Sequence, residues 1–82
     1  SNLVIPSEIN GQKVVGIADN SFGNKNINSV IIPNTVEYIG DKSFIGNKIK
    51  NINIPTSVKS IGKRAFYNNN LRYGIFYYLM YI

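Results

Sequence analysis

Apolar residues recur along this chain in a pattern that repeats every 22 positions. The segment 27–39 returns as 49–61, so that Ile32-Pro33 is followed by Ile54-Pro55. Two more sets of equivalent positions, here called columns, step by the same interval: Ile17, Ile39 and Ile61, and Phe22, Phe44 and Phe66. Apolar positions that keep this register are typical of a solenoid, in which each repeat is one coil stacked on near-copies of itself.

The residues within one repeat predict its local structure. Val30 and Ile32 have the two-residue spacing of the inward positions of a half-buried strand, and the β-branched side chains of residues 30–32 suit a paired strand. Pro33 ends the strand because it has no N–H for the ladder. We expect a tight or positive-φ corner at Gly40 and at its repeat, Gly62. Residues 41–44 then predict a single helical or 3₁₀ turn, which Asp41 caps, and Phe44 enters the core.

These elements predict one partial solenoid array over residues 1–82, built mainly from short parallel strands. Its first coil covers about residues 3–26, its second about 27–48 and its third about 49–70. The first coil is longer, and Asn10-Gly11 is a strong hairpin signal. We therefore expect a hairpin insertion at 7–14 that shields the end of the stack.

The repeat becomes divergent in residues 71–82. Leu71 continues the column of Ile27 and Ile49, but the positions after it form an aromatic tail. Three interpretations are open: a terminal cap strand, a truncated coil whose partner is missing, and a sequence that is not native to the array. Phe76 falls on the column of Ile32 and Ile54, which favours the cap strand.

Composition excludes several functional classes. The net charge is +5, but the nine basic residues are scattered, whereas a nucleic-acid footprint is normally clustered on one element. The apolar stretch 75–82 is far shorter than the roughly 20 residues that span a bilayer. The absence of Cys excludes a disulfide framework. The chain begins at Ser1 without a signal sequence, and we interpret it as a mature or excised fragment.

The residues available for catalysis are few. The chain has no His and no Cys, which removes the commonest general base, the thiol nucleophile and most transition-metal ligands. Asp19 and Asp41 stand 22 positions apart and should lie on adjacent coils, where they could form a glycosidase pair or a Ca²⁺ site. We favour a structural role for both, because they share one capping position. The sequence therefore predicts no enzyme activity, no metal and no cofactor.

Recognition by an exposed surface remains. Residues that flank the inward positions of the predicted strands should face solvent, and repeat solenoids bind partners on such sheet faces. Asn2 and Val4 supply these positions in the first coil, and part of the face is apolar, which can mark an interface. The candidate contacts with a protein partner are Ser29, Ile31, Asn51, Asn53, Tyr73 and Ile75.

Two segments carry a resemblance to a known family. Residues 32–44 (Ile-Pro-x-x-Val-x-x-Ile-Gly-x-x-Ser-Phe) and residues 54–66, which end in Ala-Phe, are similar to the BspA-type leucine-rich repeat of bacterial and some protozoan surface proteins. The opening 5–14 is similar to the first unit of many such arrays, so the resemblance covers about residues 3–71. Many members carry Cys shortly after the Phe, where this chain has Asn or Gly, and Ser21 and Ser43 replace the usual Ala.

The resemblance implies a leucine-rich-repeat right-handed solenoid with a role in adhesion or protein binding, and it implies no catalytic residues. Our hypothesis is a fragment of a longer secreted or cell-surface bacterial protein that binds a protein of the host or of a neighbouring cell. The alternative is a structural spacer that carries another domain and has no ligand of its own. We expect no nucleic-acid partner and no membrane span in this chain.

Overall fold

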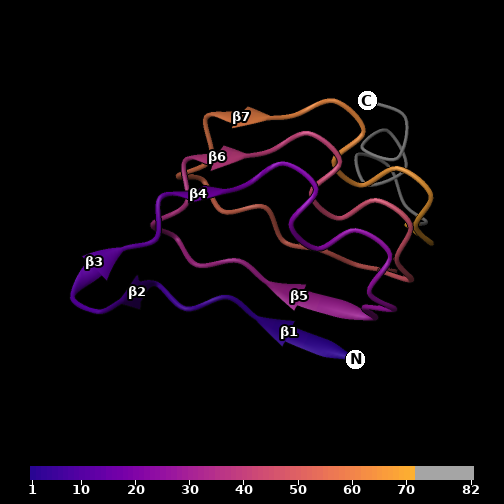
Figure 1. Ribbon diagram of the computed structural model, residues 1–82, viewed down its shortest axis with the longest axis horizontal. Helices are drawn as coiled ribbons and strands as arrows, with labels where there is room; N and C mark the ends of the chain where they lie inside the picture. The colour runs from indigo at the N-terminus through magenta and orange to yellow at the C-terminus, as the bar shows by residue number, and fades with distance from the viewer. Residues whose placement is uncertain (72–82) are drawn as a thin grey trace.

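The computed structural model describes residues 1–71 as a stack of coils with short strands (Figure 1). No helix occurs in this part of the chain. The strands are β1 (Asn2–Val4), β2 (Glu8–Ile9), β3 (Gln12–Lys13), β4 (Gly16–Ile17), β5 (Ser29–Ile31), β6 (Tyr38–Ile39) and β7 (Ser60–Ile61).

One sheet runs through all three coils. Strands β4, β6 and β7 pair in parallel, with Ile17 opposite Ile39 and Ile39 opposite Ile61. Figure 1 shows these strands lying side by side, one from each successive coil. The 22-residue step of the sequence is therefore the step from one coil to the next. This confirms a repeat solenoid with parallel strands.

A second sheet is shorter than the sequence predicts. β1 and β5 pair in parallel, with Leu3 opposite Val30, but the third-coil strand at residues 52–54, which the repeat of the predicted strand 30–32 implies, is not formed. That prediction was wrong, and the residue types give the reason. β5 carries Val30 between Ser29 and Ile31, whereas the third coil has Asn at both flanking positions, and Asn is depleted in strands.

The first coil carries an antiparallel β2–β3 pair, in which Glu8 lies opposite Lys13. Asn10 and Gly11 connect the two strands with φ of 52° and 80°, the left-handed pair that a type I′ turn requires. The pair leaves Ile9 55% exposed. An apolar pocket of about 280 Å³, here called the end pocket, stays open beside it, with Leu3, Ile17 and Phe22 in its lining.

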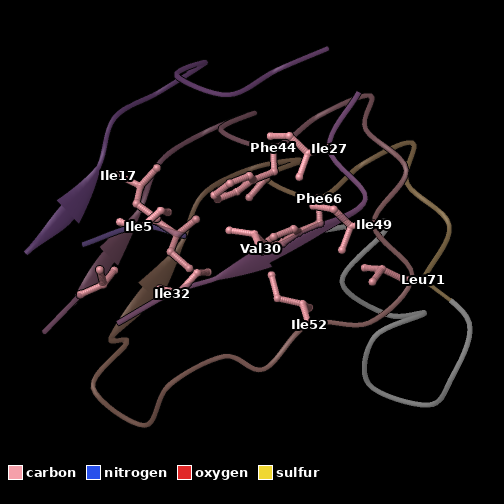
Figure 2. Packing of buried hydrophobic residues seen from close by; sticks show 13 residues of the cluster. Ile5, Ile17, Ile27, Val30, Ile32, Phe44, Ile49, Ile52, Phe66 and Leu71 are labelled. Atoms are coloured by element: carbon pink, nitrogen blue, oxygen red, sulfur yellow. The ribbon is translucent and has the colours of Figure 1, made fainter. Parts of the chain in front are cut away.

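The apolar columns meet inside the coils (Figure 2). The rings of Phe22 and Phe44 stack with centroids 5.4 Å apart, and those of Phe44 and Phe66 with centroids 5.3 Å apart and planes 2° from parallel. Phe44 and Phe66 are fully buried, and Leu71 is buried on the column of Ile27 and Ile49. The prediction that the Phe column belongs to the core is confirmed for Phe44 and Phe66, whereas Phe22 is partly buried against that core.

The expected helical or 3₁₀ turn is replaced by consecutive hydrogen-bonded turns. In the second coil the N–H of Ser43 donates to the carbonyl of Gly40, and the N–H of Ile45 donates to that of Lys42. Lys42 has a φ of 56°, and its equivalents Asn20 and Arg64 have φ of 61° and 56°. A left-handed residue at this position interrupts the helical path, so a continuous turn of helix does not form.

Gly40 and Gly62 are required for a reason other than the predicted one. Neither has a positive φ. A Cβ on Gly40 would lie 2.6 Å from the backbone nitrogen of Asp19 and 2.7 Å from the carbonyl oxygen of Ile17, and one on Gly62 would meet Asp41 in the same way. Glycine is therefore needed because adjacent coils approach each other too closely for a side chain.

Candidate protein-binding surface

The candidate contact residues on β5 face solvent. Ile31 is 62% exposed and lies opposite Val4, which is 64% exposed, so the strand pair presents two adjacent apolar side chains. On the same face, the Oγ of Ser29 donates to Oδ1 of Asn2 at 2.7 Å. An apolar pair beside a polar pair is a composition found at protein-binding patches.

Asn51 and Asn53 lie across an open cleft from β5. The cleft has a volume of about 300 Å³ and is lined by Val30–Ile32 on one wall and Asn51–Asn53 on the other. We call it the strand cleft. The structure therefore brings together three of the candidate contact residues, Ile31, Asn51 and Asn53, while Ser29 lies beside them on β5. Tyr73 and Ile75 lie outside the described residues.

The β4–β6–β7 sheet also exposes apolar side chains, which are not among the candidate contacts predicted from the sequence. Tyr38 on β6 is 50% exposed, and Val15, just ahead of β4, is also exposed. Beside Tyr38, the Nζ of Lys59 lies 3.3 Å from Oε1 of Glu37. This ion pair is exposed and contributes little to stability.

The two aspartates that raised the question of catalysis have a structural role. Oδ1 of Asp19 accepts the backbone N–H of Asp41 at 2.8 Å, and Oδ1 of Asp41 accepts the N–H of Lys63 at 2.8 Å. Each carboxylate therefore binds the following coil instead of capping the turn that it begins, which corrects the sequence-based expectation for Asp41. Within residues 1–71, no group of three His, Cys, Asp or Glu side chains is close enough to hold a metal ion.

Sequence reasoning missed the role of two buried asparagines. Asn47 accepts the backbone N–H groups of Lys25 and Ile27 through Oδ1, both at 3.0 Å, and donates from Nδ2 to the carbonyls of Phe22 and Phe44, both at 2.9 Å. Asn69 accepts the N–H of Ile49 and donates to two carbonyls in the same manner. The 22-residue spacing of Asn47 and Asn69 was the available signal.

A model of the BspA type leucine rich repeat region (6 copies) matches residues 13–77 of the chain. The chain belongs to this family. No curated protein and no solved structure matches it. BspA-type leucine-rich repeats serve as protein-binding or structural modules and are typically without catalytic activity, and the family is commonly associated with bacterial surfaces. In the described part of this BspA-type array, no helix has the length and apolar character to cross a bilayer.

Proposed function

We propose that this chain is a non-catalytic protein-binding or adhesion module of a secreted or cell-surface bacterial protein. It acts as a right-handed array of three coils (3–26, 27–48 and 49–70) followed by a divergent segment, 71–82. Its partner is a protein on a host cell or on a neighbouring cell. The contact surface is the solvent face of β1 and β5 together with Asn51 and Asn53, continued by Tyr73 and Ile75.

The observation that carries this proposal is the exposed pair of Val4 and Ile31, of which Ile31 lines the strand cleft. Both side chains are more than 60% exposed although each is a β-branched apolar residue on a paired strand. Scattered exposed apolar residues need no explanation, but an adjacent pair next to a cleft of about 300 Å³ offers a partner both apolar area and a place to insert a side chain.

The experiment compares two charge substitutions on different sheets. Ile31→Lys places an ammonium in the proposed contact surface, whereas Tyr38→Lys places one on β6, at a residue that is also about half exposed. The chain and both variants are labelled with a fluorophore and mixed with cultured epithelial cells and with intact bacterial cells, and bound fluorescence is measured by flow cytometry. We expect Ile31→Lys to lose binding by about tenfold or more, since a charge buried at an interface costs more than 1.4 kcal/mol.

Tyr38→Lys should bind as the parent does, and circular dichroism should be the same for all three proteins. Equal binding by Ile31→Lys and the parent would contradict the proposed surface. Absence of binding by the parent to either cell type would favour the alternative, a structural spacer that holds another domain away from the cell and has no ligand of its own.

A further inference from the structure

The strand cleft separates two backbone segments of neighbouring coils that do not pair with each other. On the side of the second coil the wall is Val30–Ile32, and on the side of the third coil it is Asn51–Asn53. Among residues 1–71, no backbone hydrogen bond joins these two walls. The coils are held together on either side of the cleft. The backbone N–H of Lys48 donates to the carbonyl of Ile27, and the backbone N–H of Lys59 donates to the carbonyl of Glu37.

The direction of the backbone groups on β5 follows from its bonds to the first coil. The carbonyl of Ile31 accepts the N–H of Ile5 at 3.0 Å, so the backbone N–H and C=O of Ile31 point toward β1. Successive residues of an extended strand direct their N–H and C=O groups to opposite sides. The groups of Val30 and Ile32 are therefore directed toward the cleft. These are the groups that a ladder to the third coil would have used.

A wall of this kind favours a particular ligand. A backbone N–H or C=O that leaves water without finding a partner costs about 1–3 kcal/mol, so a side chain alone is a poor occupant. An extended peptide supplies alternating donors and acceptors at the spacing of a strand. β5 already pairs with one such segment, β1, along its other edge. The six lining residues carry no charge, so the cleft offers no ion pair to stabilise a charged ligand.

We propose that the strand cleft binds an extended, uncharged segment of the protein partner, which adds as a strand to β5 and also bonds to the wall of the third coil. Apolar side chains of the segment point inward, toward the columns of Val30 and Ile52, and its alternate side chains point outward beside Ile31. This proposal rests on the proposed function and specifies the chemistry of the partner at that surface.

The test uses a peptide with the sequence of residues 1–6, Ser-Asn-Leu-Val-Ile-Pro, acetylated and amidated at its ends. This is the segment that already pairs with β5 along its other edge. Binding to the full chain is measured by nitrogen–proton NMR, with the peptide in excess. We expect shifts of the amides of Val30, Ile32 and Asn53, and little change at Tyr38 and Ser60 in the other sheet.

Methylated peptides separate strand addition from side-chain docking. A methyl group on the backbone nitrogen at the Leu position blocks one edge of the peptide, and a methyl group at the Val position blocks the other. Because the inserted strand pairs along both edges, either change should weaken binding by about tenfold or more. Binding that stays within about threefold for both methylated peptides would overturn the proposal, because side-chain contacts alone would explain it.

A matched pair of protein variants tests the same point from the wall. Asn53→Pro removes the N–H of the third-coil wall, and Asn53→Ala removes only the side chain. We expect Asn53→Pro to lose peptide binding by about tenfold and Asn53→Ala to keep it within about threefold. Equal binding by the two variants would contradict strand addition. If no peptide binds but Ile31→Lys still abolishes cell binding, the strand-addition proposal fails and the proposed function stands. If the peptide binds but the chain does not bind cells, strand addition stands and the proposed function fails.

Discussion

Ser43 places a hydroxyl group where nothing accepts its proton. The residue is fully buried, and its Oγ has no hydrogen-bond partner in the described chain. The equivalent residue of the third coil is Ala65, which is buried against the same core. A buried polar atom without a partner costs about 1–3 kcal/mol. We therefore expect Ser43→Ala to raise the free energy of unfolding by about 1 kcal/mol, measured by urea denaturation.

Ser21 provides the control for Ser43. It occupies the same column in the first coil, but it is exposed and its Oγ donates to the carbonyl of Ala18 at 2.8 Å. Ser21→Ala should leave stability unchanged or lower it by a few tenths of a kcal/mol. A loss of stability in Ser43→Ala would mean that the hydroxyl is satisfied in solution.

At the scale of single residues, the sequence indicated which positions are structurally important, but it seldom indicated the physical reason for that importance. The Phe column, the inward Ile positions and the importance of Gly40 were all visible as a 22-residue repetition. The reason for Gly40 was not visible, because the close approach of Asp19 and Ile17 is a distance between coils. Nor does a sequence pattern show that Lys42 takes a positive φ, since that backbone angle favours Gly or Asn.

At the scale of the element, the turn that follows each Phe depends on a buried asparagine. Asn47 bonds to two N–H groups and two carbonyls, and these belong to the first and second coils. Removal of the amide leaves all four backbone groups without this partner. We expect Asn47→Ala to lower the free energy of unfolding by about 2–4 kcal/mol, measured by urea denaturation.

Asn53→Ala is the matched control, because Asn53 is exposed and makes no side-chain hydrogen bond with other described residues. Its effect should stay within about 0.5 kcal/mol. A small effect of Asn47→Ala, similar to that of Asn53→Ala, would show that water replaces the amide without cost.

The elements themselves were only partly predictable. A strand near residues 30–32 and a hairpin turn at Asn10-Gly11 follow from local residue types, and the structure has paired strands at both places. The parallel strands at the Ile17 column were not predicted. The third-coil repeat of the predicted strand 30–32 does not form a strand, because the repeat preserves inward Ile52 but not the outward residues. Periodicity reports which side chains are buried, whereas pairing also depends on the flanking residues. The cleft in the candidate surface results from this difference and was therefore not predictable.

At the scale of the whole molecule, the first coil differs from the others at its outer face. Position 18 carries Ala where the later coils carry Gly40 and Gly62. In those coils a Cβ would meet the backbone of the preceding coil at 2.7 Å or less. Ala18 lies in the lining of the end pocket, on the side where no described coil precedes it. A coil added there in the same geometry would collide with its methyl group.

We therefore predict that Ala18 prevents extension of the stack at this end, and a fusion tests this. A second copy of residues 27–49 placed directly ahead of Ser1 brings Leu3 and Ile5 into the register that Ile52 and Ile54 have after Ile49. With Ala18 present, we expect the fused coil to leave the free energy of unfolding unchanged. With Ala18→Gly, the coil can approach, cover Phe22 and Leu3, and add about 2 kcal/mol or more.

Two further variants separate this effect from the cost of glycine itself. Ala18→Gly without the fused coil should lose about 0.5–1 kcal/mol, because glycine gives up more backbone freedom on folding. Gly40→Ala in the unfused chain should be strongly destabilising, since it places the same methyl group between two coils that are already in contact. Equal stabilisation by the fused coil with and without Ala18 would contradict the prediction, because the end would then accept a coil despite the methyl group. The expected pattern would instead show that one carbon atom decides whether the apolar end of the stack can be extended by its own repeat.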